Sequence, residues 1–126
     1  MILIIDDSPT DIELTTIALE ETGREIRVSS APDGKSALAL LRNGMMPSLI
    51  LLDLKMPGMS GIEVLRAIRA DDRLREIPVV VFTSSSLESD SEEALAAGAS
   101  DYLEKSLSLY QISKDLASVL NRWLTD

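Results

Sequence analysis

Short apolar runs alternate along the chain with longer segments in which apolar residues recur every three or four positions. The short runs are rich in β-branched and bulky residues and lie at 2–5, 26–28, 49–52, 79–82 and 102–103. Runs of this length that are apolar on both faces are typical of strands buried in a parallel sheet. The pattern therefore predicts five strands.

A helical pattern follows each of these runs. The first begins at Ser8-Pro9 and stops at Gly23, and the others are expected at about 35–42, 60–71, 89–97 and 107–124. Ser60 and Glu63 have the spacing of a capping box. A strand followed by a helix, five times over, predicts an α/β doubly wound, five-stranded parallel sheet with helices on both faces.

Length and charge narrow the classes of protein that fit this pattern. The chain has 126 residues, which suits one domain spanning 1–126, and its 45% apolar content is that of a globular protein. The net charge is −9. Such an acidic chain is poorly suited to hold nucleic-acid phosphates or anionic lipid, so we expect neither nucleic acid nor membrane as a partner.

The chain contains neither Cys nor His. This excludes thiolate zinc sites, Ser-His-Asp triads, His-ligated metals and a phosphoryl-accepting His. Any metal site must use oxygen ligands, which favours a hard cation such as Mg²⁺ or Ca²⁺. The apolar runs are too short to span a bilayer and the first residues lack a secretion signal, so a cytoplasmic location is expected.

Polar residues follow four of the predicted strands at the point where each strand ends. Asp6 and Asp7 follow the first strand, Asp53 the third, Thr83 the fourth and Lys105 the fifth. Ligands of open parallel sheets bind beyond the carboxyl ends of the strands, so these side chains are expected to share one pocket. Each of them alone is equally typical of a turn, a helix cap or a solvated loop.

Three carboxylates in one pocket repel one another. Two unit charges about 4 Å apart cost roughly 4 kcal/mol at an effective dielectric constant near 20. Such a cluster either takes up protons or holds a cation, and Mg²⁺ with several retained waters fits an all-oxygen site. A divalent cation and the Lys105 ammonium would together stabilise a phosphoryl group that arrives on a carboxylate oxygen.

These residues lie in stretches that closely resemble the response-regulator receiver domain of two-component signalling. The stretches are Ile4-Ile5-Asp6-Asp7 and the segments 51–61, 77–83 and 97–105, and the resemblance covers about residues 2–122. It implies the flavodoxin-like receiver fold, with sheet order 2-1-3-4-5, an order for which a receiver protein is itself a standard example. This order of strands is implied by the resemblance, since the hydrophobic pattern alone does not determine it.

The resemblance also implies a role for each residue at the metal. Asp53 would be the phosphoacceptor and would contact Mg²⁺ together with three further groups. Asp7 would ligate the ion directly, Asp6 would act largely through water, and the backbone carbonyl of Lys55 would complete the protein ligands.

Three other positions match the receiver residues that respond to the phosphoryl group. Thr83 would hydrogen-bond a phosphoryl oxygen, Lys105 would form an ion pair with it, and Tyr102 sits at the position of the rotameric aromatic switch. The family usually has Pro after this Lys, joined by a cis peptide bond, whereas here Ser106 follows. The Lys-Ser pair and the run at 74–81 are similar to stand-alone regulators paired with phytochrome-type kinases.

The resemblance implies a signalling switch rather than an enzyme, with only self-catalysed phosphorylation and dephosphorylation. A sensor histidine kinase or a histidine phosphotransfer protein would donate the phosphoryl group. A homodimer through the fourth helix, fifth strand and fifth helix is a further expectation, because Tyr102 lies on an expected edge strand and the last helix carries an apolar face ending in Trp123.

Two other functions remain open at this point. A receiver-like binding module that is not phosphorylated would use the same fold. A phosphohydrolase with an Asp nucleophile would use a similar sheet, although such enzymes favour a second Asp two residues after the nucleophile, where this chain has Lys55.

Overall fold

A computed structural model describes residues 1–124 of the chain. Within this range the five strands are β1 (Ile2–Ile5), β2 (Val28–Ala31), β3 (Leu49–Leu52), β4 (Val79–Thr83) and β5 (Asp101–Glu104). They form one parallel sheet in the order β2-β1-β3-β4-β5. This confirms the doubly wound sheet expected from the sequence, and it leaves β2 and β5 at the two edges.

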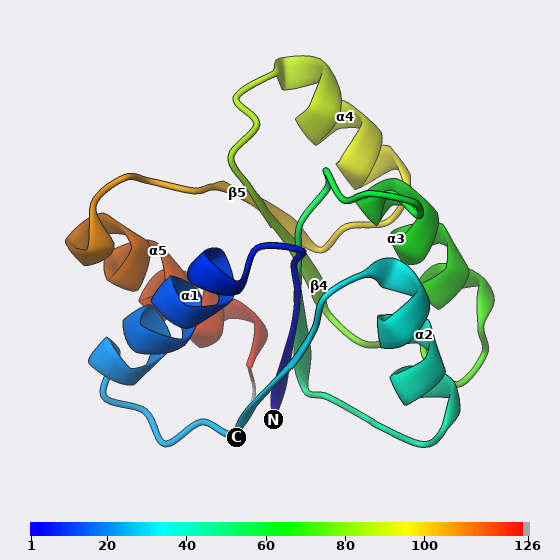
Figure 1. The fold of residues 1–126 in the computed structure, drawn as a ribbon, viewed down its shortest axis with the longest axis horizontal. Helices are drawn as coiled ribbons and strands as arrows, with labels where there is room; N and C mark the ends of the chain where they lie inside the picture. The colour runs from blue at the N-terminus through cyan, green and yellow to red at the C-terminus, as the bar shows by residue number, and fades with distance from the viewer. Residues whose placement is uncertain (125–126) are drawn as a thin grey trace.

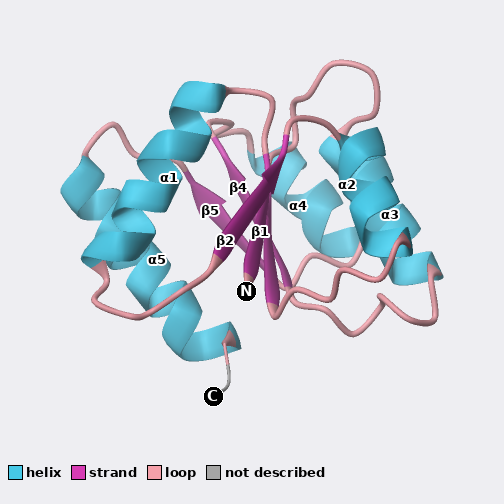
Figure 2. Ribbon diagram, turned by 60° about the horizontal axis from the view of Figure 1, so that its bottom comes forward, coloured by secondary structure: helices cyan, strands magenta, loops and turns pink. Residues whose placement is uncertain are grey.

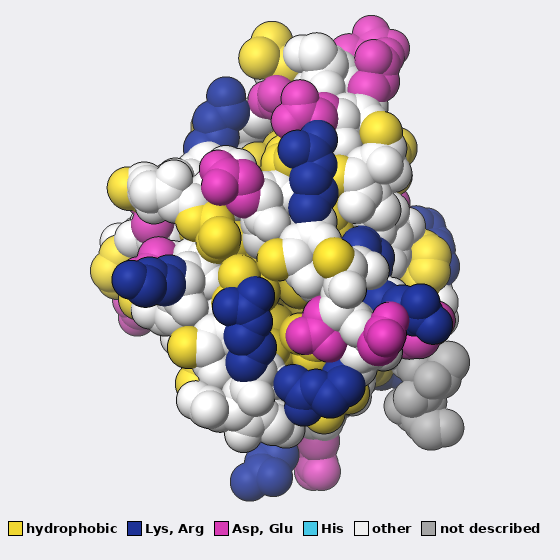
Figure 3. All heavy atoms as spheres, turned by 90° about the vertical axis from the view of Figure 1, so that its right-hand side faces the viewer, with side chains coloured by type: hydrophobic (Ala, Val, Ile, Leu, Met, Phe, Trp, Pro, Cys, Tyr) yellow, Lys and Arg dark blue, Asp and Glu magenta, His cyan; other side chains and the backbone are white. Residues whose placement is uncertain are grey.

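Five helices of the described chain cover the two faces of the sheet: α1 (Pro9–Glu21), α2 (Gly34–Arg42), α3 (Gly61–Ala70), α4 (Glu88–Ala96) and α5 (Leu109–Trp123). Helices α1 and α5 lie on one face, and α2, α3 and α4 lie on the other (Figures 1 and 2). On the side where α2 and α3 meet solvent, basic and acidic side chains are interspersed (Figure 3). None of these helices is long and apolar enough to cross a membrane.

The central strands are buried on both faces because successive side chains of a strand point to opposite sides. In β1, Leu3 and Ile5 belong to a core cluster with residues of α2 and α3, whereas Ile2 and Ile4 belong to a cluster with residues of α1 and α5. This explains why the run has no polar alternation. A parallel sheet covered by helices on both faces requires such a run.

Local signals fix where most of the helices begin. The Ser8 side chain accepts a hydrogen bond from the backbone of Asp11 at the start of α1. Ser60 and Glu63 form both bonds of the predicted capping box at the start of α3. Helix α4 differs, since its N-cap is Leu87 and has no side-chain cap. Of its residues in the described chain, only Ala94 is buried.

Two elements begin at different residues from those that the sequence predicted. Strand β2 lies at Val28–Ala31 rather than at 26–28. It is an edge strand whose two serines face outward in part, so an apolar run does not mark it. Helix α5 begins at Leu109 rather than at 107, because Ser108 caps it and leaves Leu107 fully exposed.

Candidate functional site

The carboxyl ends of β1 and β3 bring three acidic side chains together. One carboxylate oxygen each of Asp6, Asp7 and Asp53 lies within 4.8 Å of the others. Asp6 and Asp53 are buried, whereas Asp7 is exposed. The predicted cluster is therefore present, and oxygen ligands of this kind fit Mg²⁺, which needs one or two carboxylates and retained waters.

Backbone contacts hold Asp53 firmly at the end of β3. The Asp53 amide donates to the carbonyl of Ile5 at 3.0 Å, and the Gly61 amide donates to the carbonyl of Leu54 at 2.9 Å. A Cβ atom on Gly61 would collide with the Asp53 carbonyl oxygen. Helix α3 can thus begin against the backbone of Asp53 only because residue 61 is glycine.

The ammonium of Lys105 lies among three carboxylates. Its Nζ is 2.6 Å from Asp6 Oδ2, 2.9 Å from Asp11 Oδ2 and 3.4 Å from Asp53 Oδ2. The Lys105 amide also donates to the carbonyl of Thr83 at 2.7 Å, which fixes its backbone beside β4. The Lys105–Ser106 peptide bond is trans. Replacement of the usual Pro by Ser106 therefore still leaves the ammonium in the acidic pocket.

Asp11 is a residue of this pocket that the sequence analysis did not assign to it. It lies in the first turn of α1, where an acidic residue is typical of a helix start. Because α1 begins immediately after the Asp6-Asp7 pair, its first turn lies above the same end of the sheet. That proximity in sequence is the signal that could have identified Asp11.

Burial and charge act in opposite directions on the pocket. Burial raises the pKa of the Asp6 carboxyl, and hydrogen bonds from Lys105 and from the Ser8 amide offset this only in part. Burial alone would lower the pKa of Lys105, but its bonds to Asp6 and Asp11 and the charge of Asp53 raise it overall. The ammonium therefore stays charged, and the pocket retains an excess of negative charge that favours a further cation.

Thr83 and Tyr102 both contact Ser85, in the loop between β4 and α4. The Ser85 amide donates to Thr83 Oγ1 at 3.4 Å, and the Tyr102 hydroxyl donates to the Ser85 carbonyl at 3.1 Å. Thr83 is fully buried, and Tyr102 is half-buried. Burial raises the pKa of the Tyr102 phenol, with the bond to Ser85 opposing it. One loop residue thus joins the two residues predicted to form a switch.

Lys55 lies in the loop between β3 and α3. Its amide donates to Asp53 Oδ1 at 3.5 Å, at the limit of a hydrogen bond. Its side chain is exposed and points to α4, where Nζ lies 3.7 Å from Asp90 Oδ2. The structure therefore places the Lys55 backbone beside the acidic cluster and its ammonium beside a different element.

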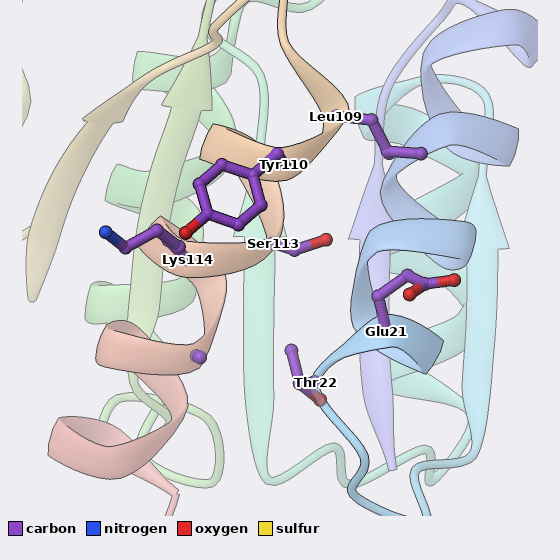
Figure 4. A pocket seen from close by; sticks show the side chains of 7 residues that line it. Glu21, Thr22, Leu109, Tyr110, Ser113 and Lys114 are labelled. Carbon is purple, nitrogen blue, oxygen red and sulfur yellow. The ribbon is translucent and has the colours of Figure 1, made fainter.

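A separate groove lies between α1 and α5 (Figure 4). Its lining comes from the last turn of α1 and the first half of α5, and comprises Glu21, Thr22, Leu109, Tyr110, Ser113, Lys114 and Ala117. The Lys114 ammonium lies 5.5 Å from the centre of the Tyr110 ring. This groove shares no residue with the acidic cluster, so the chemistry of the molecule is assigned to the strand ends.

The sequence profile described as "Response regulator receiver domain" matches residues 2–117. The chain belongs to the response-regulator receiver family. This confirms the resemblance drawn from the motifs around Asp53 and Lys105. Receivers are signalling switches, so membership disfavours the phosphohydrolase alternative.

Curated relatives of this receiver include short and long proteins. It is 35% identical over 119 residues to the protein PilH of Pseudomonas aeruginosa, covering 94% of this chain and 96% of PilH. The chemotaxis protein CheY of the same organism is 34% identical over 121 residues, covering 96% of each chain. The response regulator PleD of Caulobacter vibrioides is 40% identical over 104 residues, 82% of this chain but 22% of PleD.

Solved structures agree with this assignment and include phytochrome response regulators. The phosphorylated cyanobacterial phytochrome response regulator RcpA has a TM-score of 0.89 and 35% identity, covering 98% of this receiver and 93% of RcpA. The Mn²⁺-bound form of the response regulator Rcp1 has a TM-score of 0.85 and 34% identity, with the same coverage. The predicted similarity to phytochrome partners is thereby confirmed at the level of fold and sequence.

Proposed function

We propose that this receiver accepts a phosphoryl group on Asp53 from a phosphohistidine of a sensor histidine kinase or histidine phosphotransfer protein. The observation that carries the proposal is the position of Asp53, whose carboxylate lies between an acidic pair and the Lys105 ammonium. Negative charge must be balanced as the phosphoryl group arrives on the nucleophilic carboxylate. The acidic pair offers a site for a divalent cation, and Lys105 supplies an ammonium. RcpA, a phosphorylated protein of the same fold, supports this.

The residues at the strand ends suit a bound Mg²⁺. Asp7 and Asp53 would ligate it directly, Asp6 would act through water, and the Lys55 carbonyl would complete the protein ligands. Bound Mg²⁺ would neutralise charge on the transferred phosphoryl oxygens. The Mn²⁺-bound form of Rcp1 supports a divalent cation at this kind of site. Lys105, which now bonds Asp6 and Asp11, would turn its ammonium to the phosphoryl group.

The switch begins at Thr83. Its hydroxyl accepts a bond from the Ser85 amide and still has its own proton to donate to a phosphoryl oxygen. Turning toward Asp53 would break the contact with Ser85 and free the loop that also holds Tyr102. The ring of Tyr102 would then repack inward, and the surface formed by α4, β5 and α5 would change.

Substitution of the acceptor tests the assignment directly. Asp53→Asn is expected to abolish the one-phosphoryl mass gain that the wild type shows with acetyl phosphate and Mg²⁺, because the amide cannot act as the nucleophile. Intact-mass spectrometry measures this. Asp72→Asn, which changes an exposed carboxylate outside the metal cluster, is the control and should still be labelled. Full labelling of Asp53→Asn would disprove the role of Asp53.

A homodimer through α4, β5 and α5 remains a proposal, but its apolar contacts differ from those expected. Trp123 is half-buried against the core cluster of α1 and α5, and its Nε1 donates to Asp101 at 3.1 Å. It therefore closes the base of the sheet. The exposed apolar side chains on these elements include Leu87 and Leu95, 58% and 52% exposed, at the N-cap of α4 and in its last turn, and Tyr110 of α5, 72% exposed.

A further inference from the structure

The carboxylate of Asp90, in α4, contacts both of the loops that flank Asp53. Its Oδ2 accepts a hydrogen bond from Ser85 Oγ in the β4–α4 loop and lies 3.7 Å from Lys55 Nζ in the β3–α3 loop. The Asp90 side chain is 25% exposed, whereas that of Lys55 is 67% exposed. A single, half-buried carboxylate thus joins two segments that follow different strands.

Each of the two residues bonded by Asp90 reaches the phosphorylation site through its backbone. The Ser85 amide donates to Thr83 Oγ1, and the Ser85 carbonyl accepts from the Tyr102 hydroxyl. The Lys55 amide donates to Asp53 Oδ1. Asp90 is therefore connected to Asp53 through Lys55. It is connected to Thr83 and Tyr102 through Ser85.

Ser85 also connects Asp90 to the start of its own helix. The Ser85 hydroxyl donates to Asp90 and accepts a hydrogen bond from the Leu87 amide at 3.3 Å. Leu87 is an N-cap without a side-chain cap, so the Leu87 amide is bonded by Ser85, whose hydroxyl is in turn held by Asp90. The position of the first turn of α4 is therefore tied to the position of the β4–α4 loop.

We propose that Asp90 is a positioning residue that holds both loops, and with them Thr83 and Tyr102, in the unphosphorylated arrangement. The proposal rests on the function proposed above for Asp53. While Asp90 holds Ser85, the Thr83 hydroxyl stays bonded to the loop and Tyr102 stays bonded to the Ser85 carbonyl. When the contacts of Asp90 with Ser85 and Lys55 break, α4 becomes free to move.

Lys55 connects this release to phosphorylation. A phosphoryl group on Asp53 brings a charge of about −1.5 to −2, and it attracts an ammonium more strongly than one carboxylate does. The Lys55 ammonium would then leave the Asp90 carboxylate and contact the phosphoryl group instead. Loss of this ion pair would remove an attraction that holds α4 against the β3–α3 loop, which favours movement of α4 away from that loop.

Two variants of Asp90 and one control separate the effect of its hydrogen bond from the effect of its charge. Asp90→Asn keeps an oxygen acceptor for Ser85 but removes the attraction for Lys55, and Asp90→Ala removes both contacts. Glu93→Gln is the matched control. Glu93 lies on the same helix, lines the same groove beside Lys55, and has no hydrogen bond or ion pair with Ser85 or Lys55.

The first measurement needs no phosphoryl group. The chain contains two Tyr residues, so 3-fluorotyrosine labelling gives two ¹⁹F resonances, and Tyr110→Phe assigns that of Tyr102. Asp90→Ala is expected to move the Tyr102 resonance from its wild-type position, Asp90→Asn to move it less, and Glu93→Gln to leave it in place. An unmoved resonance in Asp90→Ala overturns the proposal, whether or not Asp53 is a phosphoacceptor.

The second measurement is the affinity for beryllofluoride with Mg²⁺, read from the same resonances. Removing a contact that favours the unphosphorylated state should tighten the binding of beryllofluoride. In Asp90→Asn the affinity should rise about threefold, because the variant loses one exposed ion pair. Asp90→Ala should gain about tenfold, because a hydrogen bond is lost as well. Affinities equal to that of Glu93→Gln overturn the proposal. A wild type that binds no beryllofluoride and gains no phosphoryl mass refutes the phosphoacceptor function instead, and the first measurement still decides the role of Asp90.

Discussion

At the scale of single residues, Asp6 and Asp7 are neighbours with different surroundings. Asp6 is buried, its Oδ1 accepts from the Ser8 amide, and its Oδ2 is 2.6 Å from Lys105 Nζ. Asp7 is exposed at the mouth of the same cluster. Both Asp6 oxygens thus already have partners within the protein, and Asp7 is the carboxylate of the pair that is open to a hydrated ion.

Mg²⁺ affinity should therefore fall more in Asp7→Asn than in Asp6→Asn. Loss of a group that acts through an intermediary costs about tenfold in metal affinity, which is the expectation for Asp6, and loss of a direct ligand costs more. Titration calorimetry with Mg²⁺ measures the affinities, and Glu92→Gln, an exposed acid of α4, is the control. Equal affinity in the wild type and both variants would count against the metal site.

The residues that the sequence identified at the site are those that follow strands. Asp6, Asp7 and Asp53 could be grouped because the carboxyl ends of parallel strands share one edge of a sheet. Asp11 lies on a helix and was not assigned to the site, although its closeness to Asp6-Asp7 along the chain is a signal that could have placed it there. Asp90 could not be assigned, because its contacts with Ser85 and Lys55 depend on how α4 is oriented, which hydrophobic spacing does not determine.

At the scale of elements, caps, buried runs and the edge strand β5 could be predicted, whereas the edge strand β2 was misplaced. The Ser60–Glu63 box forms as expected, since it depends only on residues within one turn. Strand β2 was placed too early, because an edge strand with outward-facing serines lacks the apolar signature. Family resemblance, rather than the pattern, predicted the order of the strands.

The attachment of α5 to β5 gives a pH-dependent prediction. Burial tends to raise the pKa of Asp101, but bonds from Trp123 Nε1, the Tyr102 amide and Arg122 lower it overall. A folded-state pKa below the unfolded value of about 3.9 means that this stabilisation is complete above about pH 3.9 and is lost as pH falls through the folded value.

Asp101→Asn should accordingly reduce the free energy of unfolding by about 1 kcal/mol at pH 7, since it removes the ion pair with Arg122. Below about pH 4 the difference from the wild type should shrink. Urea titrations between pH 7 and pH 3 measure this, and Asp72→Asn, an exposed acid after α3, provides the comparison. A difference that stays constant with pH would show that charge at Asp101 does not stabilise the fold.

At the scale of the whole molecule, one edge of the sheet and one helix are open to a partner. Strand β5 is an edge strand, and Leu87 and Leu95, at the two ends of α4, are more than half exposed. An unpaired edge and exposed apolar side chains are features of contact surfaces, so we propose that a second copy or another protein binds here. Phosphorylation would act on this surface through Ser85 and Tyr102.

Sedimentation tests whether the partner is a second copy. With Mg²⁺ and beryllofluoride the wild type is expected to sediment as a dimer, and Leu95→Ser to weaken dimerisation by about tenfold in its dissociation constant, since it removes one apolar contact. Met46→Ser, an exposed apolar residue before β3, is the control. A monomer with and without beryllofluoride at high concentration would leave a different protein as the recipient of the signal.

The sparse packing of α4 has a consequence for how such a signal is transmitted. Within residues 1–124 this helix buries only Ala94, so a small local free energy holds it against the sheet. Under the proposal for Asp90, exchange of the Lys55 ion pair would then be enough to shift the population of α4 between two positions. The central strands, which are buried on both faces, keep their geometry while this happens. Under the proposed function, the rigid sheet would hold the phosphoryl acceptor in place, and α4, one loop beyond β4, would change position in response.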